Sequence, residues 1–82
     1  MREEFLEALR NANQVIVCIV YNGVNILNAV FNPEDVCTYD DNEIVLGSGN
    51  NLVTLLGDIN YDEDENLYVF TYDSLLTEIS VS

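Results

Sequence analysis

The stretch VIVCIVYNGVNILNAVF, residues 15–31, decides the fold. Its first seven residues are continuously apolar and mostly β-branched, which is typical of a strand covered on both faces. The dipeptide Asn22-Gly23 follows at once and tolerates the positive φ angles of a type I′ turn, so that Val24 to Phe31 returns as the partner strand. We therefore predict a β-hairpin over residues 15–31.

The residues before this hairpin have the periodicity of a helix. Apolar side chains recur at helical spacing at Phe5, Leu6 and Leu9. Negative side chains gather near the N-terminal end, where the helix dipole favours them: Glu3, Glu4 and Glu7. We predict a short amphipathic helix over residues 2–12, ended by Asn11 and Asn13.

Downstream of the hairpin, short β-forming stretches alternate with turn residues. We predict short strands over 36–39 and 43–46, a flexible loop over 47–51, and a strand or a helix from Leu52 to Ile59. The acidic run 62–65 reads as a turn before a strand over 66–72. The tail from Leu75 to Val81 is expected to add an edge strand or a helical turn.

The expected fold is thus a single acidic α+β domain over residues 1–82, with one N-terminal helix followed by a mostly antiparallel sheet of five or six strands. Alternation along the late strand places two apolar sets on opposite faces: Leu67, Val69 and Thr71, and Tyr68, Phe70 and Tyr72. One helix covers only one face. Either the sheet curls into a small barrel, or the C-terminal segment or another chain covers the second face. An open aromatic face would make a homodimer or a partner contact.

Charge separates this chain from most small domains. It carries 15 Asp and Glu against two arginines, with no Lys or His, and its net charge is −13 at pH 7. Domains of this size ordinarily carry a net charge of about 2 to 8 in magnitude. Such a chain repels nucleic acid, anionic lipid and acidic substrates, so we expect it to bind none of them directly. The favoured partner is a basic protein surface; a halophilic environment, which makes acidity generic, is the alternative.

Composition also sets the class of the protein and its compartment. Hydrophobic residues make up 49% of the chain, which favours a folded domain over disorder. No apolar run approaches the roughly 18 residues that span a bilayer. Acids stand at Glu3 and Glu4, where a signal peptide has basic residues. We expect a cytoplasmic location, in the host cytoplasm if the protein is phage-encoded, and free thiols at Cys18 and Cys37.

Few residues favour catalysis or cofactor binding. Without histidine, catalytic triads and the commonest metal ligand are excluded. Cys18 lies mid-strand and is expected in the core, while Cys37 is expected to be structural or exposed. Gly47-Ser48-Gly49 lacks both the Walker A and the dinucleotide spacing. A calcium loop starting at Asp58 fails at two diagnostic positions, which hold Glu63 and Val69. We expect no enzyme, no cofactor and no dedicated metal site, with at most loose cation binding by residues 62–65.

The placement of the acids carries the functional hypothesis. One turn contains Asp40, Asp41 and Glu43, and a second region contains Asp58, Asp62, Glu63, Asp64 and Glu65. In an extended segment, Asp62 and Asp64 would form one row and Glu63 and Glu65 another, with about 6.6–7 Å between successive members. Such rows resemble the phosphates of a nucleic-acid strand and would attract a Lys- and Arg-rich groove. Alternatively, the run is a solvated turn that prevents aggregation of the sheet.

In size, acidity and expected architecture, the chain resembles the small acidic inhibitors of phages: the anti-CRISPR proteins and the phage uracil-DNA glycosylase inhibitor. Locally, residues 61–66, YDEDEN, with the strand from Leu67 to Thr71 and then Asp73, are similar to an acidic turn and following strand of the glycosylase inhibitor. That inhibitor has a second N-terminal helix and acids in its first strand, whereas residues 15–21 here carry no charge. The resemblance implies a protein that occupies the nucleic-acid site of its target.

The sequence therefore predicts an inhibitor that mimics nucleic acid and binds the basic groove of a DNA- or RNA-binding protein, such as a CRISPR or other host defence nuclease. Its contacts would be the two acidic clusters. The alternative is an immunity protein, antitoxin or accessory subunit that docks through Tyr68, Phe70 and Tyr72, where aromatic anchors rather than charge dominate the affinity.

Overall fold

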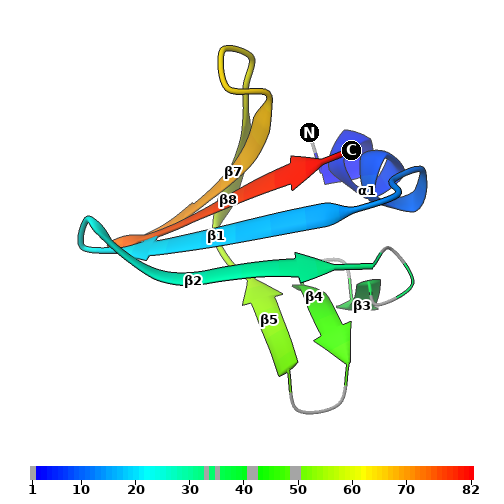
Figure 1. Ribbon diagram of the computed structural model, residues 1–82, viewed down its shortest axis with the longest axis horizontal. Coiled ribbons are helices and arrows are strands. Elements are labelled where there is room, and N and C mark those ends of the chain that lie inside the picture. The colour runs from blue at the N-terminus through cyan, green and yellow to red at the C-terminus, as the bar shows by residue number, and fades with distance from the viewer. Residues whose placement is uncertain (1, 33, 35, 41–42, 49–50) are drawn as a thin grey trace.

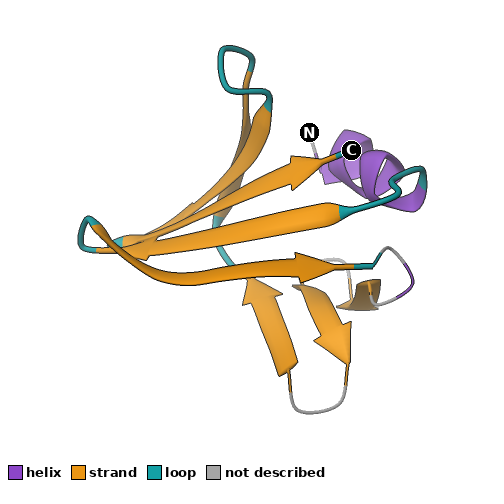
Figure 2. Cartoon of the chain, in the orientation of Figure 1, coloured by secondary structure: helices purple, strands orange, loops and turns teal. Residues whose placement is uncertain are grey.

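The computed structural model describes residues 2–32, 34, 36–40, 43–48 and 51–82, without the side chains of 36–40, 48 and 51. In these residues one helix is followed by strands (Figures 1 and 2), which confirms the α+β class. The elements in chain order are α1 (Arg2–Arg10), β1 (Val15–Tyr21), β2 (Val24–Phe31), β3 (Val36–Asp40), β4 (Glu43–Ser48), β5 (Asn51–Leu55), β6 (Asp58–Asp62), β7 (Leu67–Tyr72) and β8 (Leu75–Val81).

The strands form two antiparallel sheets. The larger has the order β2-β1-β8-β7-β6 and the smaller the order β3-β4-β5. Strand β8 pairs with β1 from Val15↔Val81 to Tyr21↔Leu75 and with β7 on its other side. The tail is therefore a strand, as one alternative held, but it is central and not an edge. The sequence of a strand does not indicate which distant strands will flank it.

The β1–β2 hairpin has the bounds that the sequence predicted. Asn22 and Gly23 have φ angles of 50° and 80°, which a type I′ turn requires. The pairing shifts between Ile19 and Val20, so that Ile26 is the extra residue of a β-bulge in β2. The turn residues therefore made the position of the hairpin predictable, whereas no signal in the sequence predicted the bulge.

The expectation that β1 is covered on both faces is wrong. Val15 and Val17 are 0% exposed, whereas Ile16, on the opposite face, is 41% exposed. The physical reason is that α1 and the smaller sheet pack on the same face of the larger sheet. Their buried side chains belong to one core cluster together with residues of that face: Phe5, Leu9, Val15, Val17, Ile44, Leu46, Leu55, Phe70 and Ile79.

The region between residues 47 and 59 differs most from expectation. Gly47 and Ser48 extend β4 and pair with Leu52 and Asn51, so the described residues of the expected loop over 47–51 are strand, and residues 49 and 50 lie outside the described residues. The expected strand or helix over 52–59 is instead two strands, which belong to different sheets and are separated at Leu56 and Gly57. Gly57 has a φ of 90°, and a Cβ there would lie 2.0 Å from the carbonyl oxygen of Thr71. This close approach lets the chain change sheets.

The larger sheet is open. In the part of the chain that the structure describes, its order ends at β2 and at β6, and these two strands are not paired with each other. The alternative of a curled small barrel is therefore wrong. Two aromatic side chains of β7, Tyr68 and Phe70, are instead covered by the helix, because the Phe5 ring lies 5.0 Å from that of Tyr68 and 5.1 Å from that of Phe70, centroid to centroid.

Candidate functional site

The acidic run 62–65 lies at the end of the β6–β7 hairpin and has a defined backbone. The Asp62 Oδ1 atom accepts hydrogen bonds from the amides of Asp64, at 3.0 Å, and Glu65, at 3.1 Å. Asn66 has a φ of 59°, and the Tyr61 hydroxyl donates to its side-chain oxygen. This is an Asx turn, in which a short polar side chain satisfies backbone amides that the strands leave free. We call residues 62–65 the acidic tip.

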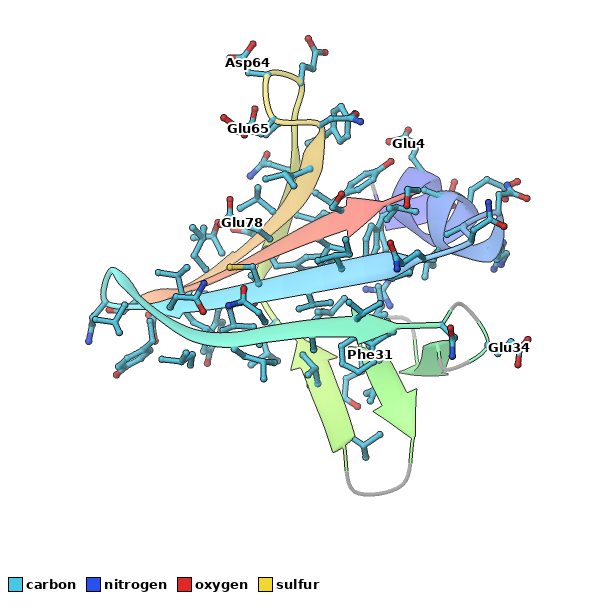
Figure 3. The ribbon with its side chains drawn as sticks, in the orientation of Figure 1. Glu4, Phe31, Glu34, Asp64, Glu65 and Glu78 are labelled. Atoms are coloured by element: carbon cyan, nitrogen blue, oxygen red, sulfur yellow. The ribbon has the colours of Figure 1, made fainter. Side chains whose placement is uncertain are left out.

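The acidic tip extends beyond the rest of the larger sheet. Figure 3 shows Asp64 and Glu65 at the outer end of the hairpin, and the side chains of Glu63, Asp64 and Glu65 are exposed. Three other acids, Glu4, Glu34 and Glu78, lie in separate places (Figure 3). The acids of the chain are thus partly clustered and partly dispersed.

The two rows of carboxylates expected for residues 62–65 do not form. They required an extended backbone, but the segment turns because the Asp62 carboxylate binds the amides of Asp64 and Glu65. A single row of two carboxylates with one amide between them lies instead along β6. Asp58, Asn60 and Asp62 are alternate residues of this strand and share one face, with about 6.6–7 Å between successive members. The structure therefore joins Asp58 to the acidic tip through one edge strand.

The second acidic cluster belongs to the smaller sheet. Asp40 ends β3 and Glu43 begins β4, and these two residues are paired in the sheet register. Glu43 is exposed, and Asp41 lies outside the described residues. In Figure 1, β3 and β4 lie well away from the end of the β6–β7 hairpin. The structure therefore does not bring the two clusters together into one site.

The predicted aromatic docking face is largely covered. Phe70 is only 4% exposed and Tyr68 is half-buried against the core, because Phe5 of α1 packs on both rings. Tyr72, on the same face, is 52% exposed. Of the three, only the Tyr72 ring offers a large surface to a partner.

Tyr72 lines a groove that sequence reasoning missed. It has a volume of about 580 Å³ and is lined by Tyr21, Leu56, Tyr72, Asp73, Ser74 and Leu75. We call it the tyrosine groove. Tyr21 ends β1 and is aligned with Leu75, which is in turn aligned with Tyr72. In the structure, Tyr21 lies on the same face of β1 as the buried Val15 and Val17, and no signal in the sequence paired β1 with β8.

The positive charge of the chain is confined to the helix. Its two basic residues, Arg2 and Arg10, are the first and last residues of α1. Arg10 Nη1 lies 3.7 Å from Glu7 Oε2, and both side chains are well exposed, so this ion pair stabilises the fold little. The groove and the acidic tip are formed by the strands and turns of a segment that carries no basic residue.

Cys18 was expected in the core, but the structure does not place it there. Cys18 is a half-buried free thiol on the open face of the larger sheet, and its Sγ accepts a hydrogen bond from Asn25 Nδ2 at 3.0 Å. The side chain of Cys37 lies outside the described residues. Among the side chains that the structure describes, no three potential ligands gather in a way that would hold a metal ion.

Comparison with known proteins identifies no relative. No protein-family model, no curated protein and no solved structure matches the chain. Within the described residues, no helix is long and apolar enough to cross a membrane. The resemblance to small phage inhibitors stays a prediction, and function has to be argued from the surface of this α+β protein itself.

Proposed function

We propose that this protein is an inhibitor that mimics nucleic acid and binds the basic groove of a DNA- or RNA-binding protein, such as a CRISPR or other host defence nuclease. The observation that supports it is the acidic tip, in which four consecutive acids occupy a turn that Asp62 holds through two backbone amides. Asp58 adds a carboxylate on the same edge strand. The proposed contacts are Asp58, Asp62, Glu63, Asp64 and Glu65.

Fixed geometry favours this function over mere solvation of a turn. A carboxylate cluster on an ordered backbone loses less conformational entropy on binding than one on a mobile loop. The net charge of −13 adds long-range attraction toward a basic groove, which accelerates association and makes it sensitive to salt. Asp40 and Glu43 lie in the other sheet, and the cluster predicted for them together with Asp41 stays a separate prediction.

An inhibition assay tests the proposal. Purified guide-loaded CRISPR nucleases and a uracil-DNA glycosylase are assayed on their DNA substrates with and without the protein. The variant D62N/E63Q/D64N/E65Q removes four charges, while the amide side chain introduced at position 62 retains the oxygen that caps the turn. The control E3Q/E4Q/E7Q/E34Q removes the same number of charges at other exposed positions. We expect the control to inhibit like the wild type and the tip variant to lose at least tenfold in potency, because several charge-assisted contacts disappear together.

Competition distinguishes mimicry from other modes of inhibition. A mimic and the substrate DNA exclude each other, so the apparent inhibition constant should rise in proportion to the DNA concentration. Equal potency of the tip variant and the control, or an inhibited enzyme that still holds its DNA, would contradict the proposal. The absence of inhibition across the panel would also count against it.

A further inference from the structure

The tyrosine groove lies on the same sheet face as the core but at the opposite end from α1. Three of its residues form one row across three strands, because Tyr21 of β1 is aligned with Leu75 of β8 and Leu75 with Tyr72 of β7. Neighbouring strands are about 4.8 Å apart, so the two tyrosines stand about 9.6 Å apart across the sheet. Leu75 therefore lies between the two tyrosines in the row, and all three line the groove.

The groove remains open because nothing in the described residues covers it. Tyr21 is 50% exposed, Tyr72 is 52% exposed and Leu56 is 40% exposed. Its volume of about 580 Å³ lies within the range of about 300–1,000 Å³ that is typical of ligand sites. Two exposed rings and two leucines form a larger apolar surface than an isolated exposed residue would.

The lining of the groove is chemically selective. Among the described residues that line it, the ionisable groups are the two tyrosine phenols and the Asp73 carboxylate, and Ser74 adds a hydroxyl. An aromatic face attracts a cation, most strongly where water is partly excluded. A carboxylate at the rim attracts the same charge, and leucines accept the methylene stem of a long basic side chain. The net charge of −13 disfavours an anionic ligand at any part of this surface.

The backbone also fixes the part of the groove that Leu56 lines. Leu56 is held by Gly57, whose φ of 90° and close approach to the Thr71 carbonyl leave no space for a side chain. The β7–β8 turn is held on the other side, because the Asn22 amide donates to the Ser74 carbonyl at 3.1 Å. Asp73 is therefore anchored between two paired strands. A site on paired strands is more rigid than one on a free loop.

From these observations we infer that the tyrosine groove binds an arginine or lysine side chain, with its apolar neighbours, from a basic peptide segment of a partner protein. The cation would lie between Tyr21 and Tyr72 and near the Asp73 carboxylate, and its stem would lie on Leu75 and Leu56. This site is separate from the acidic tip, and the inference does not depend on the function proposed above. It gives the protein a second, aromatic contact for a basic partner.

Two small peptides test this inference. The probe is N-acetyl-leucyl-arginyl-leucinamide, and the matched control replaces arginine by citrulline, which has nearly the same shape without the charge. Each is titrated into ¹⁵N-labelled protein at physiological salt, and amide chemical shifts give both the site and the dissociation constant. We expect shifts at residues 21, 56 and 72–75, with about tenfold tighter binding of the arginine peptide.

Three variants assign the contacts. Tyr72→Leu keeps an apolar side chain but removes the ring, and should weaken the arginine peptide about three- to fivefold. Asp73→Asn keeps a residue that tolerates the φ of 50° found there, and should weaken the arginine peptide about threefold without changing the citrulline peptide. Val30→Ala, on the opposite face of the sheet and 61% exposed, is the control that should change neither.

Each remaining outcome would overturn the inference. Shifts confined to residues 62–65 would show that the arginine peptide binds the acidic tip instead. Equal affinity for the two peptides would show an apolar groove without selectivity for a cation. The absence of shifts at the groove up to millimolar peptide would show that the groove binds no such side chain.

Discussion

The two ends of one sheet face differ although their residues are alike. At one end, Tyr68 and Phe70 pack under Phe5 of α1. At the other end of the same face, Tyr72 and Tyr21 are half exposed. A helix of nine residues is about 13 Å long, whereas β8 with seven residues spans about 23 Å. The helix is too short to cover the whole face. The smaller sheet packs on another part of it, and the end that holds Tyr21 and Tyr72 stays half exposed as the tyrosine groove.

The alternation of residues along a strand therefore predicts on which face of the sheet a side chain lies, but not whether another element packs over it. Tyr68, Phe70 and Tyr72 share a face, as the sequence predicted, yet they have three different degrees of exposure. The helix covers the first two rings, and the third stays half exposed. The following changes test the contrast between the covered end and the open end, in order of decreasing effect.

Removing the ring that covers the first end should have the largest effect. Phe5 is 0% exposed and touches both Tyr68 and Phe70, so Phe5→Ala should lower the free energy of unfolding by about 3–5 kcal/mol. A domain of this length has a total stability of only about 4–12 kcal/mol. Urea denaturation followed by tyrosine fluorescence measures the loss. Phe5→Leu should lose less than half as much, and a small loss for Phe5→Ala would refute the proposed role of the helix.

The open end has its own rigid element in Gly57. Gly57→Ala should lower stability by about 2–3 kcal/mol, because the new Cβ would combine the strain of positive φ with a clash at 2.0 Å from the Thr71 oxygen. Gly23→Ala is the matched control, since Gly23 also has a positive φ, of 80°, but has nothing within 4 Å of its Cβ position. It should lose only about 1–2 kcal/mol. Equal losses would mean that the crossing beside β7 is not tight.

The acidic tip adjoins the covered end and depends on one side chain. Asp62→Ala removes the acceptor of two backbone hydrogen bonds and should lower stability by about 1 kcal/mol. Asp62→Asn keeps an oxygen at that position and should lose less. Thermal unfolding of both variants gives the comparison. A loss for Asn as large as that for Ala would mean that charge, and not the capping oxygen, stabilises the turn.

The smallest effect is expected in the groove itself. Tyr72→Leu should change the free energy of unfolding by no more than about 0.5 kcal/mol, because the ring is half exposed and packs under no helix. Phe70→Leu, two residues earlier on the same strand and face, is the control and should lose about 1 kcal/mol or more. If the two variants lose equal stability, the contrast between the two ends is wrong.

The elements that could be predicted from the sequence are those that depend on neighbouring residues. The β1–β2 hairpin was predicted with its bounds because Asn22-Gly23 is a local signal, and α1 was predicted to within two residues of its end. The position of β8 between β1 and β7, the division into two sheets and the break at Gly57 were not predicted, because each depends on residues far apart in the sequence.

The candidate site, too, was predicted only where it depends on residues that are close in the sequence. Four consecutive acids identified the acidic tip, but the Asx turn replaced the expected rows because the Asp62 side chain captures nearby amides. The tyrosine groove was missed because Tyr21, Leu56 and Leu75 come together only through the sheet pairing and the crossing at Gly57. The covering of Phe70 was missed because the position of α1 on the sheet has no local signal.

The crossing at Gly57 also connects the groove to the interior. Leu55 is 3% exposed and belongs to the core, whereas Leu56, the next residue, is 40% exposed and forms a wall of the groove. A ligand that restrains Leu56 therefore also restrains the end of β5, and through it the pairing with β4. Occupancy of the groove should slow amide hydrogen exchange in the smaller sheet, even though no ligand atom reaches it.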